Sequence, residues 1–339
     1  MKPTAEVQTE GPTRGQRFHT PVFIVGCVRS GTTLLYHMLL SAGGFAVYRT
    51  ETHALNLLEP RFGDLSVRKN RQRLMEVWLD SKLFNESGLE GEFITTKVLD
   101  ECRNGGDFLR IVMGEIARKQ GMLRWAECTP EHVLCLPRIR ETLPDALIIH
   151  IIRDGRDVAL STMKQGWIRP FPWDRGRPLA ACALYWEWMV RKGREDGALF
   201  GANYREVLFE DLVAHPAREL ARLSEFIGQE LDYERIRKVG IGSVSSPNSS
   251  FSSEPSQFNP VGRWRESLSQ QDLQILEGLC GDLLLELGYP LSHVGTALNG
   301  RLHLSRLRAT YLNWFKLKLW AKHKTPLGPL LVTKKLTWL

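Results

Sequence analysis

Apolar and polar positions follow two different periods along the chain. The sequence predicts strands at 22–26, 124–128, 146–152 and 204–210. Some of these are continuous apolar runs, which are typical of strands covered on both faces of a sheet, and others are shorter strand-like stretches. Between them, apolar residues recur every three or four positions, which predicts helices at 31–43, 107–120, 130–143, 179–199 and 269–287 and another after Pro216. Asp107 is the predicted N-cap of the second of these helices. This order predicts an α/β fold of three layers, with a central parallel sheet flanked by helices.

The same pattern divides the chain into three parts. Residues 1–20 contain no apolar run and are expected to form a mobile arm. Residues 21–295 are predicted to form one domain, and 296–339 a basic, aromatic tail that is helical. The Ser-, Pro- and Asn-rich stretch 242–264 is longer than an ordinary connection, so we expect it to act as a lid or binding loop.

Composition places the 339-residue chain among ordinary globular proteins, with 43% hydrophobic and 24% charged residues. Its six cysteines include no C-x-x-C pair, so we expect no disulfide scaffold and no cysteine metal site. The sequence contains no apolar leader and no run of about 18 apolar residues. A cytoplasmic protein is therefore predicted, with contact at a membrane surface as an option for the tail.

The net charge of +7 belongs to the tail. Nine of the 45 Lys and Arg residues lie between Arg301 and Leu339, where no Asp or Glu occurs, which leaves 36 basic and 38 acidic residues in the first 300. A nucleic-acid-binding fold should be basic throughout, so no nucleic-acid partner is predicted. The tail itself is typical of a helix packed on the domain or on the second subunit of a homodimer, of a membrane-surface segment, or of a polyanion-binding segment.

The first predicted strand leads into a glycine-containing loop and a helix, "VFIVGCVRSGTTLL". Gly26, Gly31 and Thr33 are in register with G-x-x-x-x-G-K-[ST], but Thr32 stands at the lysine position. Backbone N–H groups at the helix N-terminus would still bind an anion, with Arg29 as the nearest cation, whereas magnesium-triphosphate chemistry lacks its lysine. A donor with phosphate-like oxygens is favoured, and a turn without a ligand or a magnesium-dependent nucleotide kinase or triphosphatase are the alternatives.

This loop resembles the 5′-phosphosulfate loop of the sulfotransferases that use 3′-phosphoadenosine-5′-phosphosulfate (PAPS) and have a P-loop-like fold. It is most similar to their tyrosylprotein, glycosaminoglycan and bacterial branch, and the resemblance extends over about residues 20–290. It implies donor contacts from Arg29, Ser30, Gly31, Thr32, Thr33 and Leu34.

Two later segments resemble the other donor sites of that family. In "IIRDGRDVALS" the resemblance implies that Arg153 and Ser161 hold the 3′-phosphate, and a guanidinium suits phosphate through paired hydrogen bonds. A solvated turn with local ion pairs is the alternative. In "NPVGRWRESLS" it implies donor contacts from Gly262, Arg263 and Trp264, with a buried structural role as the alternative for Trp264.

A fourth segment departs from the family pattern. "WAECTPEH" matches W-G-E-K-T-P-x-H, but Cys128 replaces a lysine that commonly contacts the donor. A reactive cysteine needs a basic neighbourhood and a partnered histidine. We therefore interpret Cys128 as a core or donor-lining side chain and not as a nucleophile.

Sulfuryl transfer to a hydroxyl group calls for a base near the loop. The resemblance implies Glu51, in "VYRTETHALNLL", as the first candidate and His132 as the second, while Arg29 would stabilise charge on the transferred group. His53 lies two residues after Glu51. A carboxylate at a helix N-terminus and a packed histidine are the respective alternatives.

The sequence thus predicts a PAPS-dependent sulfotransferase that acts without a metal on a hydroxyl of a carbohydrate, lipid or small metabolite. The magnesium-dependent kinase or triphosphatase and a non-catalytic adenosine-bisphosphate-binding protein are the alternatives. Acceptor specificity is expected from segments 55–105 and 166–180, which are rich in Trp, Phe, Arg and Pro.

Overall fold

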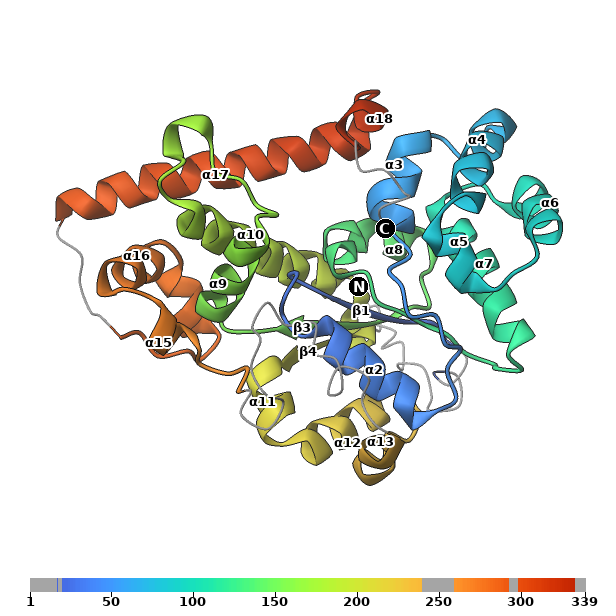
Figure 1. The fold of residues 1–339 in the computed structure, drawn as a ribbon, viewed down its shortest axis with the longest axis horizontal. Coiled ribbons are helices and arrows are strands. Elements are labelled where there is room, and N and C mark those ends of the chain that lie inside the picture. Colours follow the sequence, from blue (N-terminus) through green and yellow to red (C-terminus); the bar gives the residue numbers. More distant parts are fainter. Residues whose placement is uncertain (1–16, 18–19, 240–258, 293–297, 333–339) are drawn as a thin grey trace, which may run out of the picture.

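Four parallel strands form the central sheet, in the order β2-β1-β3-β4 (Figure 1). They are β1 (Val22–Gly26), β2 (Ala126–Glu127), β3 (Leu147–Ile152) and β4 (Tyr204–Leu208). The computed structural model describes residue 17 and residues 20–239, 259–292 and 298–332. Helices flank this sheet, so the predicted α/β class is confirmed. Most of the predicted N-terminal arm and residues 242–258 of the predicted lid lie outside the described residues.

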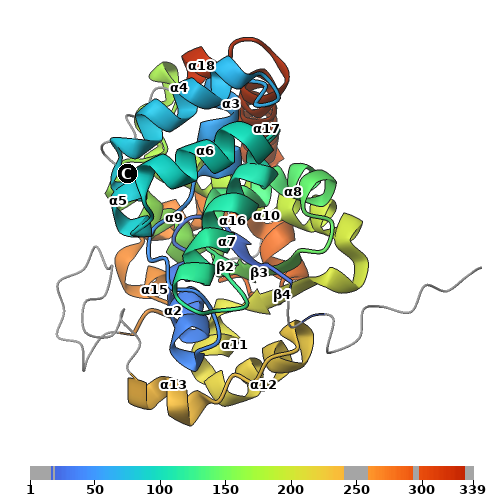
Figure 2. The same ribbon diagram turned by 90° about the vertical axis from the view of Figure 1, so that its right-hand side faces the viewer.

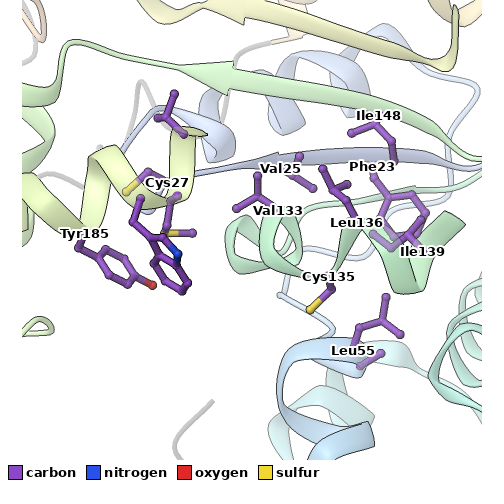
Figure 3. Packing of buried hydrophobic residues seen from close by; sticks show 14 of the residues in the cluster. Phe23, Val25, Cys27, Leu55, Val133, Cys135, Leu136, Ile139, Ile148 and Tyr185 are labelled. Carbon is purple, nitrogen blue, oxygen red and sulfur yellow. The ribbon is translucent and has the colours of Figure 1, made fainter. Parts of the chain in front are cut away.

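Both faces of the sheet are buried, as the continuous apolar runs predicted. Along β1, Phe23 and Val25 join one hydrophobic cluster, whereas Val22 and Ile24 join another, and all four are 0% exposed. Figure 3 shows the first cluster, in which side chains of β1 meet those of α8 (Leu136–Thr142). The alternation follows from strand geometry, because successive side chains point to opposite faces.

Separate sets of helices cover the two faces. One face packs on α2 (Thr32–Ala42), α11 (Phe209–Ala214), α12 (Pro216–Ile227) and α13 (Tyr233–Val239). The other packs on α7 (Gly105–Lys119), α8, α9 (Gly155–Gln165), α10 (Pro178–Gly197) and α16 (Gln270–Glu286). Figure 1 shows α11, α12 and α13 on the opposite side of the sheet from α9 and α10.

Helix boundaries follow local capping signals. The N-cap of α7 is Asn104, whose side chain accepts a hydrogen bond from the Asp107 backbone, so the prediction of Asp107 as the cap was wrong. The predicted helix 130–143 is divided into a 3₁₀ segment, η2 (Pro130–Cys135), and α8, because Pro137 fits only the first turn of a helix.

Short helices fill the long connection between α2 and α7. They are a π-helical turn, η1 (Ala54–Leu58), followed by α3 (Glu59–Phe62), α4 (Arg68–Leu79), α5 (Lys82–Ser87) and α6 (Gly91–Glu101). Both views show α3, α4, α5 and α6 gathered away from α11, α12 and α13 (Figures 1 and 2). Trp78 of α4, 1% exposed, anchors them through an edge contact with Phe108 of α7 at 5.4 Å between ring centroids.

The basic tail contains the 27-residue helix α17 (Leu298–Lys324), followed by α18 (Gly328–Leu331). Arg308 of α17 donates two hydrogen bonds, of 2.8 and 2.5 Å, to Glu187 of α10. Tyr311 donates to Asp174 of the short η3 (Pro172–Asp174) at 2.8 Å. These contacts dock α17 along α10 (Figure 1). No helix in the described part of the chain is both long and apolar enough to cross a membrane.

Candidate active site

The carboxyl ends of β1 and β3 meet at the centre of the sheet. These strands are hydrogen-bonded neighbours, although the chain forms β2 between them on the other side of β1. Residues 27–31 follow β1, and Arg153 follows β3 directly. In open α/β sheets ligands bind in the crevice at such a reversal of strand order.

The loop after β1 brings its backbone close to its surroundings. Gly31, the N-cap of α2, has a φ of 95°, and a Cβ there would lie 2.3 Å from the Phe209 ring. Arg29 has a φ of 71°, an unusual conformation for a residue other than glycine. Ser30 is 0% exposed, and its Oγ has no hydrogen-bond partner among the described residues. Such strain and an unsatisfied buried hydroxyl are typical of a ligand-binding loop.

The two predicted donor arginines lie together. Arg153 donates through Nη1 to the carbonyl oxygen of Arg29 at 3.0 Å and through Nη2 to the carbonyl oxygen of Pro260. Arg29 donates through Nε to the Ser161 hydroxyl at 3.0 Å. The resemblance assigned Arg29 and Ser161 to different ends of one donor, and the structure places them in direct contact.

Asp157 connects the 259–264 segment to this loop. Its carboxylate accepts from the backbone N–H groups of Gly262 at 2.8 Å and Trp264 at 2.9 Å, and it lies 3.7 Å from Arg153. The Trp264 indole donates to Asp154 at 3.1 Å and is only 4% exposed. Trp264 therefore anchors the segment in the arrangement expected of a buried structural tryptophan.

Four cations from four segments influence one another at this crevice. The pKa of Arg29 is lowered by burial and then by Arg153, and the same two causes lower the pKa of Arg263. Burial and then Arg263 lower the pKa of Lys164 on α9. Repulsion among these cations is relieved by bound negative charge. Arg153 Nε has no hydrogen-bond partner among the residues that the structure describes. This nitrogen and the mutual repulsion of the cations make the crevice suitable for a ligand with several anionic groups.

Glu51 belongs to a chain of polar contacts beside the loop. His53 Nε2 lies 3.3 Å from the Glu51 carboxylate. The Asn56 amide nitrogen lies 3.3 Å from His53 Nδ1 and donates to Glu131 at 2.7 Å. Because that amide can only donate, Nδ1 accepts and the ring proton is assigned to Nε2. The protonated nitrogen of His53 thus lies on the side of the Glu51 carboxylate, 3.3 Å away.

Cys128 interacts with both Glu51 and the start of α2. Burial raises the pKa of the Cys128 thiol well above its usual value, and the neighbouring carboxylates of Glu127 and Glu51 raise it further. A hydrogen bond with the Thr32 side chain opposes this rise only in part. The thiol is therefore neutral, and it interacts with both the base candidate and Thr32 at the start of α2.

His132 is enclosed by protein. It is 0% exposed, its Nδ1 lies 2.9 Å from Glu127, and its Nε2 accepts from the Leu55 backbone at 3.3 Å. Burial alone would raise the pKa of Glu127, but His132 and hydrogen bonds from Thr129 and Thr52 outweigh burial and lower it. With both ring nitrogens occupied, His132 connects η2 to η1, as expected of a packed histidine.

A cavity of about 300 Å³ lies where α10, residues 167–169 and α17 meet. Five aromatic residues contribute to its lining: Trp167, Tyr185, Trp188, Trp314 and Phe315. Asn56 and Glu131 line it as well. Of the two segments expected to set acceptor specificity, the first contributes only Asn56 and the second only residues 167–169.

A comparison with protein-family models shows which family the chain belongs to. A model of the Sulfotransferase family matches residues 21–233. The chain belongs to this family. The predicted enzyme class, a sulfotransferase, is therefore confirmed.

This sulfotransferase is 25% identical over 328 residues to nodulation protein NoeE of Sinorhizobium fredii (strain NBRC 101917 / NGR234), an alignment that covers 87% of the chain and 73% of NoeE. The sulfotransferase domain from the Synechococcus PCC 7002 olefin synthase has a TM-score of 0.50 and 20% identity, over 86% of this chain and all of that domain. The sulfotransferase domain from the curacin biosynthetic pathway also has a TM-score of 0.50, with 15% identity over 80% of this chain and 98% of that domain. These structural likenesses show the fold.

Several site residues of the sulfotransferase were not predicted from the sequence. Asp157 binds two backbone groups of a segment more than a hundred residues away, which local sequence does not reveal. Asn56 contacts His53 and donates to Glu131, and only the closeness of His53 to Glu51 in sequence pointed to this network. Helix α17, which forms one wall of the aromatic cavity, lies outside residues 21–233, the part of the chain that the family model matches.

Proposed function

We propose that this sulfotransferase transfers the sulfuryl group of PAPS to a hydroxyl group of a carbohydrate, a lipid or another small metabolite. One observation carries the proposal: the loop after β1, the residues after β3 and the 259–264 segment converge on a crevice whose cations repel one another. A nucleotide with phosphates at both ends and a terminal sulfonate would supply the missing negative charge.

The family's donor motifs can be assigned roles in this crevice. Backbone groups of Ser30 to Leu34, with the hydroxyls of Thr32 and Thr33, would hold the 5′-phosphosulfate at the N-terminus of α2. Arg153, Arg29 and Ser161 would hold phosphate oxygens through charge-assisted and hydroxyl hydrogen bonds. Gly262 and Arg263 would close over the nucleotide, held by Trp264. Bound PAPS supplies an activated sulfuryl group.

Glu51 is proposed as the base. The acceptor oxygen forms a bond to sulfur while its proton passes to the Glu51 carboxylate, and the bond from sulfur to the bridging phosphate oxygen breaks, which leaves adenosine 3′,5′-bisphosphate. His53 and Asn56 act as positioning residues because they fix the orientation of Glu51. His132 is given a positioning role, since its enclosed ring offers no nitrogen to an acceptor.

No metal is proposed for this reaction. A sulfuryl group carries less charge than a phosphoryl group, so arginine and hydroxyl groups suffice at its oxygens. The kinase alternative would need both magnesium and the lysine that Thr32 replaces. The oriented carboxylate of Glu51 argues against a protein that only binds the nucleotide.

Transfer of label from ³⁵S-PAPS to a panel of sugars, long-chain alcohols and phenols, with EDTA present, tests the proposal. We expect transfer without magnesium, and in Glu51→Gln a loss of about 10²–10⁴-fold in kcat with unchanged affinity for adenosine 3′,5′-bisphosphate. Glu92→Gln, which alters an exposed carboxylate on α6, is the matched control. A magnesium requirement, or equal losses in the two variants, would contradict the proposal.

A further inference from the structure

We propose that the cavity between α10, residues 167–169 and α17 binds the sulfuryl acceptor, and that this acceptor is an apolar hydroxyl compound carrying an anionic group. The inference rests on the proposed function, because it assigns the substrate that would meet Glu51. It concerns a wall that α17 adds outside the residues matched by the family model.

The middle of the cavity is aromatic and preformed. Phe315 of α17 packs on Tyr185 at 5.5 Å and on Trp188 at 5.3 Å between ring centroids, and all three are less than 10% exposed. Trp314, the next residue, is 47% exposed and lines the same cavity. Rings of this kind favour an apolar body over a sugar, whose hydroxyl groups need polar partners.

The inner end of the cavity leads to the proposed base. Asn56, only 2% exposed, lines the cavity and contacts His53, which in turn contacts Glu51. Glu131 lines the same end, and its carboxylate interacts with Cys27, the first residue of the donor loop, whose pKa is raised by burial, then Cys182, then Glu131. An acceptor hydroxyl at this end would therefore be linked to the base through Asn56 and His53, and to the donor loop through Glu131.

The outer rim is basic. Arg169 and Lys318 are exposed, line the cavity, and form no ion pair with any carboxylate of the described residues. Lys322 and Glu131 line the cavity as well, and the Glu131 carboxylate accepts hydrogen bonds from Asn56 at 2.7 Å and Tyr185 at 3.4 Å. The cations at the mouth complement an anionic group on the outer end of the acceptor.

The size of the cavity limits the acceptor further. About 300 Å³ is at the lower end of the range for small-molecule sites. Such a volume fits a single ring system or a medium-length acyl chain. An oligosaccharide chain would extend beyond it.

Calorimetry with protein saturated with adenosine 3′,5′-bisphosphate tests the inference with three probes: 10-hydroxydecanoate, the matched uncharged 1,10-decanediol, and glucose. We expect 10-hydroxydecanoate to bind at least about tenfold more tightly than the diol, and glucose not to bind. Lys318→Glu should abolish the preference for the acid, and Trp314→Ala should weaken both chains. Lys316→Ala and Trp320→Ala, exposed positions of α17 that do not line the cavity, are the matched controls.

The binding of adenosine 3′,5′-bisphosphate, measured first, distinguishes failure of the proposed function from failure of the acceptor inference. If adenosine 3′,5′-bisphosphate does not bind, the proposed function fails. If it binds but the diol or glucose binds as well as the acid, if no probe binds, or if the control variants lose as much affinity as Lys318→Glu and Trp314→Ala, the acceptor inference is overturned and the donor site stands.

Discussion

The donor crevice and the aromatic cavity are neighbours built in different ways. The crevice lies at the ends of two sheet strands. Three of its four cations, Arg29, Arg153 and Lys164, come from short contiguous motifs within residues 21–233, and the fourth, Arg263, comes from the 259–264 segment. The cavity lies among helices, and its walls meet only because α17 docks on α10 through Arg308 and Glu187. The difference suggests that a rigid sheet fixes the chemistry common to the family, while a helix added outside the matched region sets the acceptor.

Among the variants, Arg153→Ala is expected to show most strongly that the crevice and the cavity act independently. Loss of charge-assisted hydrogen bonds should weaken binding of adenosine 3′,5′-bisphosphate by about 10–100-fold, measured by calorimetry. Arg153→Lys, which keeps the charge, should lose less. Arg110→Ala, at an exposed pair with Asp145, should bind normally. Equal losses in the Arg110 and Arg153 variants would break the comparison.

The second region is expected to respond to Arg308→Ala. This change removes two hydrogen bonds from Glu187, which is 1% exposed, so we expect about 2 kcal/mol less stability and a Tm lower by about 3 °C. Acceptor-probe binding should fall while bisphosphate binding persists. Arg306→Ala, an exposed neighbour on α17, should change neither Tm nor binding. A loss of bisphosphate affinity in Arg308→Ala would show that the regions are not separate.

Protonation of His323 at acidic pH should weaken the docking of α17. Burial, with Lys322, Lys324 and His132 nearby, lowers the pKa of His323 to about 4. Because the unfolded chain binds this proton near its usual pKa of about 6.5, stability should fall as pH drops from about 6.5 to 4, by about 2–3 kcal/mol for this residue. Chemical denaturation of wild type and His323→Gln at pH 7 and pH 4.5 measures the difference. An equal loss in both proteins would exclude His323 as its source.

The smallest effect is expected at Cys128. Its thiol is neutral and buried, so Cys128→Ser should change sulfuryl transfer by less than about threefold. Measurement of kcat with labelled donor decides this. A loss as large as that of Glu51→Gln would mean that Cys128 takes part in the reaction.

Sequence reasoning succeeded where the signal is local. The strand β1 and the helix α2 were predicted because apolar runs, Gly31 and helical spacing occur within about twenty residues. Trp314 and Tyr185 line one cavity although 129 positions separate them, and only tertiary packing brings them together. The φ of 50° at His53 and its 3.3 Å approach to Glu51 are equally invisible in the residue pattern.

The contact of the tail with a membrane surface and the formation of a homodimer stay predictions. The exposed face of α17 carries Trp314, Leu317 and Trp320, with exposed fractions of 47, 53 and 57%. These residues lie beside basic side chains, as on helices that contact anionic lipid surfaces. Of these three residues, Trp314 also lines the cavity.

The central claim is that the crevice of Arg29, Arg153 and Arg263 binds a nucleoside bisphosphate without metal. Titration calorimetry of the wild-type protein with adenosine 3′,5′-bisphosphate, and separately with magnesium-ATP, tests it most directly. The account predicts binding of the bisphosphate that is unchanged by EDTA and at least about tenfold tighter than binding of magnesium-ATP. Equal or tighter binding of magnesium-ATP, or no binding of the bisphosphate, would contradict it.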